Sequence, residues 1–177
     1  MAGKTRSVGI LRGKQPLCLV EEELISEKGK ALRILGLDFG DRRIGVAVSD
    51  ELGLTAQGEK TILRKNNRQL LDEIRQLVHR YDVELILIGY PLRLDGSKGI
   101  QCEKVDRFSG LLEISLQLPV IKWDETLSTK EAEDILREGG IHWEKRRQLV
   151  DKVAATLILQ HYLDHLAEKN IRGHLSP

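Results

Sequence analysis

Apolar positions along the chain first follow the spacing of strands. One apolar run covers 33–39 and a second covers 43–49, with only the three residues 40–42 between them. A connection this short requires an antiparallel hairpin. A third strand is expected over 60–63. The pattern therefore predicts a three-stranded antiparallel unit at the beginning of the folded region.

Beyond this unit, helices and strands are expected to alternate. Apolar residues at helical spacing, with Asn66 or Asn67 as a cap, predict a helix that reaches Tyr81. A nearly pure apolar run at 84–88 is typical of a buried central strand. The remaining expected elements are a helix around 105–112, a strand at 119–123, a helix from the capping-box sequence 128–131 to Gly139-Gly140, and a last helix over 144–168. This order predicts an α/β domain with a five-stranded mixed sheet flanked by helices.

Periodicity and composition set the expected domain limits. Residues 1–31 lack sustained periodicity, so we expect a poorly ordered extension, a domain over 32–168 and a tail over 169–177. With 41% apolar and 31% charged residues, the chain has the composition of a globular domain with one sizeable core. No apolar run approaches the roughly 20 residues that cross a bilayer, and no targeting peptide is evident. We therefore expect a cytoplasmic protein without a membrane partner.

Four acidic residues lie where an apolar residue would stabilise the fold better. Asp38 ends the first predicted strand, and Asp151 shares a face of the last helix with apolar residues. Asp124 and Glu125 follow the fifth strand. Taken singly, each has an ordinary explanation as a turn former, a strand-end acid or an ion-pair partner. Taken together, they would meet at one edge of the sheet, where clustered carboxylates bind Mg²⁺ or Mn²⁺ and a pair of such ions cleaves phosphodiesters.

Several spaced motifs carry a family resemblance. They read "LGLDFGDRRIGVAVSD", "ILIGYPLRLDGSKGIQCEKVDRF", "VIKWDETLSTKEAE" and "RRQLVDKVAATLILQHYLD". Through them the chain, from about residue 33 to 165, resembles the YqgF/RuvX family of pre-16S rRNA nucleases and Holliday-junction-resolvase-like proteins, which have the RNase H-like fold. The resemblance implies a nuclease that depends on Mg²⁺ or Mn²⁺, with two ions. The implied catalytic acids are Asp38, Asp124, Glu125 and Asp151. Asp38 and Asp151 would bind metal together with either Asp124 or Glu125, and we favour Glu125 because its side chain reaches further, with Asp124 as a supporting acid.

Basic residues near the predicted acid cluster are candidates for contact with a nucleic-acid backbone. They are Arg42 and Arg43 in the hairpin turn, Arg93 and Lys98 in the loop after the fourth strand, and Lys145, Arg146 and Arg147 at the start of the last helix. Any one such group is more often solvated surface. Because the net charge is +1 and only 4% of residues are aromatic, recognition would depend on local charge and shape and be sensitive to salt.

The resemblance leaves the substrate and the class open. The first candidate substrate is the 5′ end of precursor 16S rRNA, and the second is a branched DNA junction, whose resolution would favour a homodimer over a monomer. Thr126 stands where the family usually has arginine, which removes an expected cation. Two other classes stay open: a sugar-kinase or actin-like ATPase, for which only one copy of the phosphate motif is present, and a catalytically silent nucleic-acid-binding module.

Overall fold

The structure, a computed structural model, describes residues 31–93, 96–124, 128–140 and 143–173. Five strands and four helices make up this part of the chain. In order they are β1 (Ile34–Phe39), β2 (Arg43–Ser49), β3 (Ala56–Leu63), α1 (Asn67–Tyr81), β4 (Leu85–Tyr90), α2 (Ile100–Leu116), β5 (Val120–Asp124), α3 (Ser128–Glu138) and α4 (Trp143–Gly173). The predicted alternation of elements is confirmed. The predicted extension over 1–31 lies outside the described residues apart from its last residue.

The strands form one mixed sheet in the order β3-β2-β1-β4-β5. β1, β2 and β3 pair antiparallel, whereas β4 pairs parallel with both β1 and β5. β1, β4 and β5 therefore all end at the same side of the sheet, at Phe39, Tyr90 and Asp124, and we call this side the carboxyl edge. The expected five-stranded mixed sheet is confirmed, and with it the parallel relation of the first and fifth strands.

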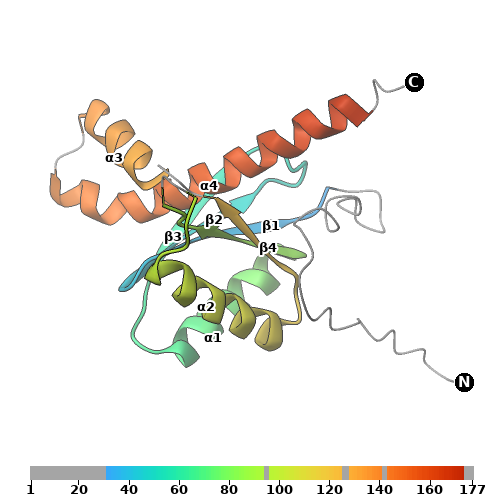
Figure 1. The fold of residues 1–177 in the computed structure, drawn as a ribbon, viewed down its shortest axis with the longest axis horizontal. Coiled ribbons are helices and arrows are strands. Elements are labelled where there is room, and N and C mark those ends of the chain that lie inside the picture. Colours follow the sequence, from blue (N-terminus) through green and yellow to red (C-terminus); the bar gives the residue numbers. More distant parts are fainter. Residues whose placement is uncertain (1–30, 94–95, 125–127, 141–142, 174–177) are drawn as a thin grey trace, which may run out of the picture.

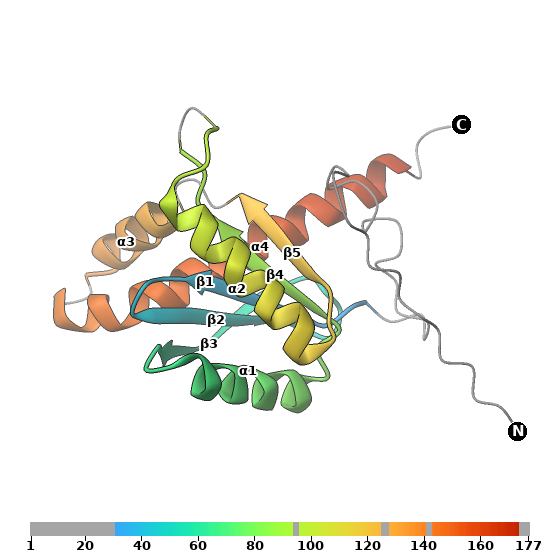
Figure 2. The same cartoon turned by 60° about the horizontal axis from the view of Figure 1, so that its bottom comes forward.

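Helices cover both faces of the sheet. α1 and α2 lie on one face and α4 crosses the other, with α3 beside α4 (Figures 1 and 2). Alternation of side chains along β1 divides its residues between two cores. Leu35, Leu37 and Phe39 pack in the core beneath α1 and α2, whereas Ile34 packs in the core beneath α4.

Small residues let α4 approach the sheet closely. Gly36, Ala47 and Gly58 form one row across β1, β2 and β3. A Cβ atom on Gly36 would lie 2.9 Å from Leu159 Cβ, and one on Gly58 would lie 2.8 Å from Thr156 Oγ1. These separations are shorter than real side chains tolerate, so the glycines set how near the helix lies. The sheet and α4 are therefore fitted to each other at backbone distance.

The closest approach is at Gly45 of β2, which is paired with Asp38 of β1. A Cβ atom there would lie 1.8 Å from the carbonyl oxygen of Asp151. Only glycine fits between the strand and the helix backbone at this point. Gly45 thus brings the helix turn that carries Asp151 next to the strand pair that carries Asp38.

Some element bounds differ from those predicted. β3 begins at Ala56 rather than at residue 60, because its polar and glycine-containing first half is held by pairing with β2 and by packing against α4. β4 continues through Gly89 to Tyr90, because both residues pair with β5. Long-range pairing, which the local sequence does not show, decides both bounds.

The last helix is longer than expected. α4 ends at Gly173, beyond the predicted end at Glu168. The segment between these residues contains no proline, and it includes good helix formers such as Lys169. It has 31 residues. Even so, among the residues that the structure describes, no helix is long and apolar enough to cross a membrane.

We predict that Gly45→Ala destabilises the protein by roughly 2–3 kcal/mol, because the added methyl group must push α4 off the sheet. Gly110→Ala is the matched control. Gly110 lies within α2, a Cβ atom there meets nothing within 4 Å, and alanine should stabilise the helix by roughly 0.5–1 kcal/mol. Urea unfolding of the two variants measures both effects. A Gly45→Ala protein as stable as the wild type would contradict the close fit.

Candidate active site at the carboxyl edge

Asp38 is an acidic residue within the packed part of β1. Its neighbours Leu37 and Phe39 point into the core beneath α1 and α2, so Asp38 lies on the opposite face, beneath α4. Burial raises the pKa of the Asp38 carboxyl, and the nearby charge of Asp151 contributes in the same direction. Together they bring this pKa to about 7. A carboxyl held in this way is ready to exchange its proton for a cation near neutral pH.

Asp151 reaches the same place from α4. Its side chain is 17% exposed, and burial raises its pKa, while the positive charge of Arg43 acts in the opposite direction. Arg43 Nε lies 2.7 Å from Asp151 Oδ2. That oxygen is nevertheless buried and accepts no hydrogen bond. The contact is therefore an ion pair in which the N–H group of Arg43 does not point at the oxygen. Asp38 and Asp151, which we call the acid pair, are thus brought together by the fold.

Asp124 is placed differently. It pairs with Tyr90 across β4 and β5, and Tyr90 belongs to the core beneath α1 and α2. Alternation therefore puts Asp124 on the face opposite the acid pair. The only described carboxylate whose charge raises the pKa of Asp38 is Asp151. The structure brings two of the four predicted catalytic acids together and does not add Asp124 to them.

The acid pair has the chemistry of a site for a hard divalent cation. Mg²⁺ and Mn²⁺ prefer carboxylate oxygens, and a buried carboxylate oxygen without a hydrogen bond has a free lone pair for such an ion. Among the described residues, no group of three or more His, Cys, Asp or Glu side chains could hold a metal ion. The predicted third ligand, Glu125, and its neighbour Thr126 lie outside the described residues. Metal binding by all three acids stays a prediction.

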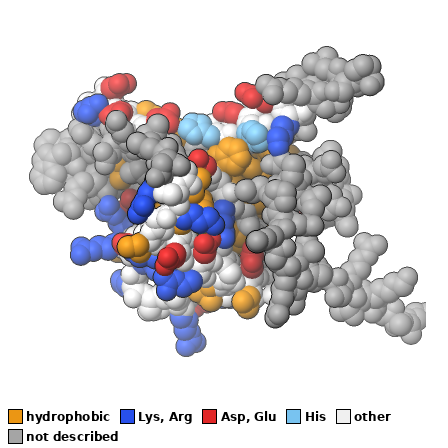
Figure 3. Space-filling model, in the orientation of Figure 1, with side chains coloured by type: hydrophobic (Ala, Val, Ile, Leu, Met, Phe, Trp, Pro, Cys, Tyr) orange, Lys and Arg blue, Asp and Glu red, His pale blue; other side chains and the backbone are white. Residues whose placement is uncertain are grey.

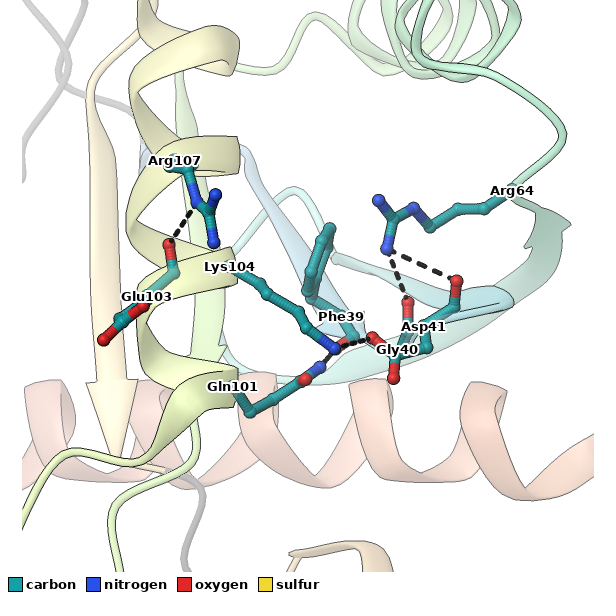
Figure 4. A network of polar contacts seen from close by, with 8 residues as sticks. All are labelled: Phe39, Gly40, Asp41, Arg64, Gln101, Glu103, Lys104 and Arg107. Atoms are coloured by element: carbon teal, nitrogen blue, oxygen red, sulfur yellow. Dashed lines mark hydrogen bonds and ion pairs between the residues drawn. The ribbon is translucent and has the colours of Figure 1, made fainter.

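Polar contacts hold the hairpin turn that follows Asp38 (Figure 4). Lys104 of α2 forms an ion pair of 2.7 Å with Asp41, and Gln101 donates a hydrogen bond to the carbonyl of Phe39. The Lys104 contact lowers the pKa of Asp41. From the other side, Arg64 donates to the carbonyl of Gly40 at 3.2 Å and lies over the Phe39 ring. Residues of α2 and of the segment that follows β3, both distant in sequence, therefore fix the end of β1.

The sequence pattern did not predict that Gln101 and Lys104 support the site. Both lie more than 60 positions from the turn they hold, as the separations of 62 and 63 residues show. The sequence of an amphipathic helix does not show which turn its polar face contacts in the folded protein. Only the packing of α2 against the sheet assigns them this role.

The predicted backbone-binding residues are distributed around the carboxyl edge. Arg42 is exposed in the turn, whereas Arg43 is engaged by Asp151. Arg93 and Lys98 are exposed in the loop after β4, where Lys98 lies 5.4 Å from the centre of the Tyr90 ring. Residues 145–147 belong to the first turns of α4, and their side chains lie outside the described part. Their contact with nucleic acid stays a prediction.

A groove of about 1010 Å³ runs along β5 from Asp124. Its lining combines aromatic, basic and acidic side chains. Among them are Tyr90, Lys98, Lys122, Trp123 and His161. Figure 3 shows histidine side chains beside a hydrophobic area on this face of the molecule. No sequence pattern predicts this groove, because the two helices and the loop that line it with β5 come together only in the folded protein.

Comparisons with known proteins identify the family of this chain. The family model described as "RuvX: Holliday junction resolvase" matches residues 32–165. A protein of Syntrophus aciditrophicus (strain SB) named "Putative pre-16S rRNA nuclease" is 60% identical over 140 residues, which cover 79% of this chain and 93% of that protein. A protein of the same name from Halothermothrix orenii is 51% identical over 134 residues, or 76% and 96% of the two chains.

Among solved structures, Thermus thermophilus RuvC in complex with a Holliday junction substrate aligns with a TM-score of 0.47 and 18% identity, over 75% of this chain and 93% of that one. This likeness is too remote to bear on activity. The family and the named relatives define a hydrolytic nuclease, whose described residues form a five-stranded mixed sheet flanked by helices. The chain belongs to the RuvX family.

We predict that Asp38→Asn stabilises the metal-free protein at pH 8 by on the order of 2 kcal/mol. The folded-state pKa of Asp38 is about 7, above its ordinary value of 3.8, so the wild type loses stability as pH rises between these values. The variant avoids this loss, and its advantage should vanish near pH 4. Thermal unfolding with a chelator, between pH 4 and pH 8, measures the difference. Parallel curves for the two proteins would refute it.

Proposed function

We propose that this protein is a metal-dependent endonuclease that processes the 5′ end of precursor 16S rRNA. The observation that carries the proposal is the acid pair, two partly buried carboxyl groups with raised pKa values at the carboxyl edge of the sheet. Two acids in such a place lower the stability of the fold unless a bound cation or another partner compensates their charge. The names of the relatives at 60% and 51% identity support RNA as the substrate.

The acids would hold one or two Mg²⁺ or Mn²⁺ ions, with Glu125 as the third ligand. When bound, such ions activate water and stabilise the leaving oxygen of a phosphodiester. The chain itself supplies the rest: Asp38 is fixed on a central strand, and Asp151 is set by the helix contact at Gly45. Hydrolysis in this fold would leave a 5′-phosphate and a 3′-hydroxyl.

Basic side chains around the carboxyl edge would bind the phosphate backbone. Arg42, Arg93 and Lys98 are exposed there, and residues 145–147 open the helix that carries Asp151. Such contacts give affinity that falls steeply with salt and little sequence preference. An rRNA substrate would place the protein in the cytoplasm, as the sequence analysis predicts.

A branched DNA junction is the second candidate substrate. The description of the matching family model, Holliday junction resolvase, favours it. Cutting two strands of a junction symmetrically requires a homodimer, whereas cleavage of a single RNA strand does not. The oligomeric state in solution therefore helps to distinguish the two substrates.

We predict that Asp38→Asn and Asp151→Asn each reduce RNA cleavage at least 100-fold, because each removes a negative charge from the acid pair while keeping its shape. The assay incubates a precursor 16S 5′-leader RNA and, separately, a four-way DNA junction with Mg²⁺ or Mn²⁺. Asp72→Asn is the matched control, since Asp72 is an exposed carboxylate of α1 that pairs with Arg75. This control should cleave like the wild type.

The outcomes separate the candidate functions. Cleavage of RNA by the wild type and not by the two variants supports the proposal, and selective cleavage of the junction favours the resolvase alternative. Cleavage that persists in both variants would refute the role of the acid pair. RNA binding without cleavage under either metal would identify a silent binding module.

A further inference from the structure

Arg43 places a cation at the oxygen that the proposed function assigns to a divalent metal. Its Nε atom lies 2.7 Å from Asp151 Oδ2, and among the described residues no other basic side chain pairs with Asp151. The oxygen accepts no hydrogen bond, so the pair lacks the aligned geometry that makes guanidinium–carboxylate contacts strong. A metal ion bound by Asp151 would compete with this guanidinium for the same oxygen.

We propose that Arg43 is the counter-ion of Asp151 in the metal-free protein, that a divalent cation displaces it, and that the released guanidinium then binds a substrate phosphate. This role rests on the proposed function for the identity of the cation. The role adds an exchange of cations. The guanidinium of Arg43 leaves the acid pair as the divalent cation arrives, and the guanidinium then binds the substrate.

The surroundings of Arg43 allow the exchange. Its backbone is fixed, because it pairs with Leu63 in β3 and its carbonyl accepts a hydrogen bond from Gly40. Its side chain is 34% exposed, whereas that of Asp151 is 17% exposed. The guanidinium side chain is therefore more open to solvent than the carboxylate that it contacts, and it can leave without unpacking the core. Only the side chain of Arg43 has to move.

The metal-free site needs such a counter-ion. Gly45, the strand partner of Asp38, lies against the backbone of Asp151, so the two acids lie close together in a partly buried place. Leaving a buried carboxylate without a compensating charge is strongly destabilising. Arg43 compensates Asp151 until a metal ion does so. Arginine also suits the second role, since its planar group binds phosphate through two parallel N–H donors.

A purely orienting role for Arg43 makes the opposite prediction. If the guanidinium held Asp151 in the position that the metal requires, removing it would weaken metal binding. If it competes with the metal, removing it strengthens metal binding. The sign of the change in metal affinity therefore distinguishes a competing counter-ion from a positioning residue.

The first test is calorimetric titration of the full chain with Mn²⁺ alone. We expect Arg43→Gln to lower the Kd for Mn²⁺ by about 3- to 10-fold. Arg43→Lys keeps the charge and should bind Mn²⁺ nearly as the wild type does. Arg75→Gln is the matched control, because Arg75 forms an exposed ion pair of the same 2.7 Å length with Asp72 on α1, and its Kd should not change. An unchanged or higher Kd for Arg43→Gln would overturn the proposal.

The second test is binding of a 20-nucleotide single-stranded RNA over a range of salt concentrations, with Ca²⁺ or with a chelator. With Ca²⁺, the salt dependence of binding by Arg43→Gln should be shallower than that of the wild type by about one phosphate contact. With the chelator, the two proteins should not differ. An equal loss in both conditions would mean that Arg43 binds RNA without prior release, and would overturn the exchange.

These readouts separate this role from the proposed function. A wild-type protein that binds Mn²⁺ but cleaves neither the RNA nor the DNA junction would refute the nuclease assignment, while both binding tests would still decide the role of Arg43. A wild-type protein that binds no Mn²⁺ would refute both.

Discussion

The close approach of α4 to the sheet is the contact on which the candidate site depends. At Gly45 the helix backbone occupies the space of a side chain, and this brings Asp151 beside the strand that carries Asp38. Gly36 and Gly58 extend the same fit along the helix. Because the interior is closely packed, a methyl group added at Gly45 would have to displace the helix turn that carries Asp151.

This arrangement explains why the acids are costly and why the fold accepts them. A carboxyl group whose pKa is raised from 3.8 to about 7 in the folded state makes the protein lose stability as the pH rises between these two values. The cost is offset by the packed cores on both faces of the sheet and, at Asp151, by Arg43. The turn after Asp38 is held by Lys104 and Arg64, which limits the freedom of the site even without a bound ligand.

The two faces of the sheet have different roles at the carboxyl edge. The face beneath α4 carries the acid pair and Arg43, while the other face carries Asp124 with Tyr90 and Lys122. The groove along β5 begins at Asp124, so it lies next to the candidate site without containing the acid pair. The groove lining joins Tyr90 and Lys122 of the face opposite α4 with Trp123 and Tyr162, which pack in the core beneath α4.

The sequence by itself determined the order of elements, the mixed sheet, and the unusual positions of Asp38 and Asp151, because hydrophobic periodicity and the cost of a misplaced charge are local properties. It placed Asp124 with the acid pair, since sequence position shows that a residue ends a strand, whereas pairing with Tyr90 decides which face the residue occupies. It assigned Arg43 to a nucleic acid and could not show that the guanidinium meets Asp151, 108 positions further along the chain. Tertiary structure alone decides such contacts, because they arise where α4 crosses the sheet, and no local pattern records that distance.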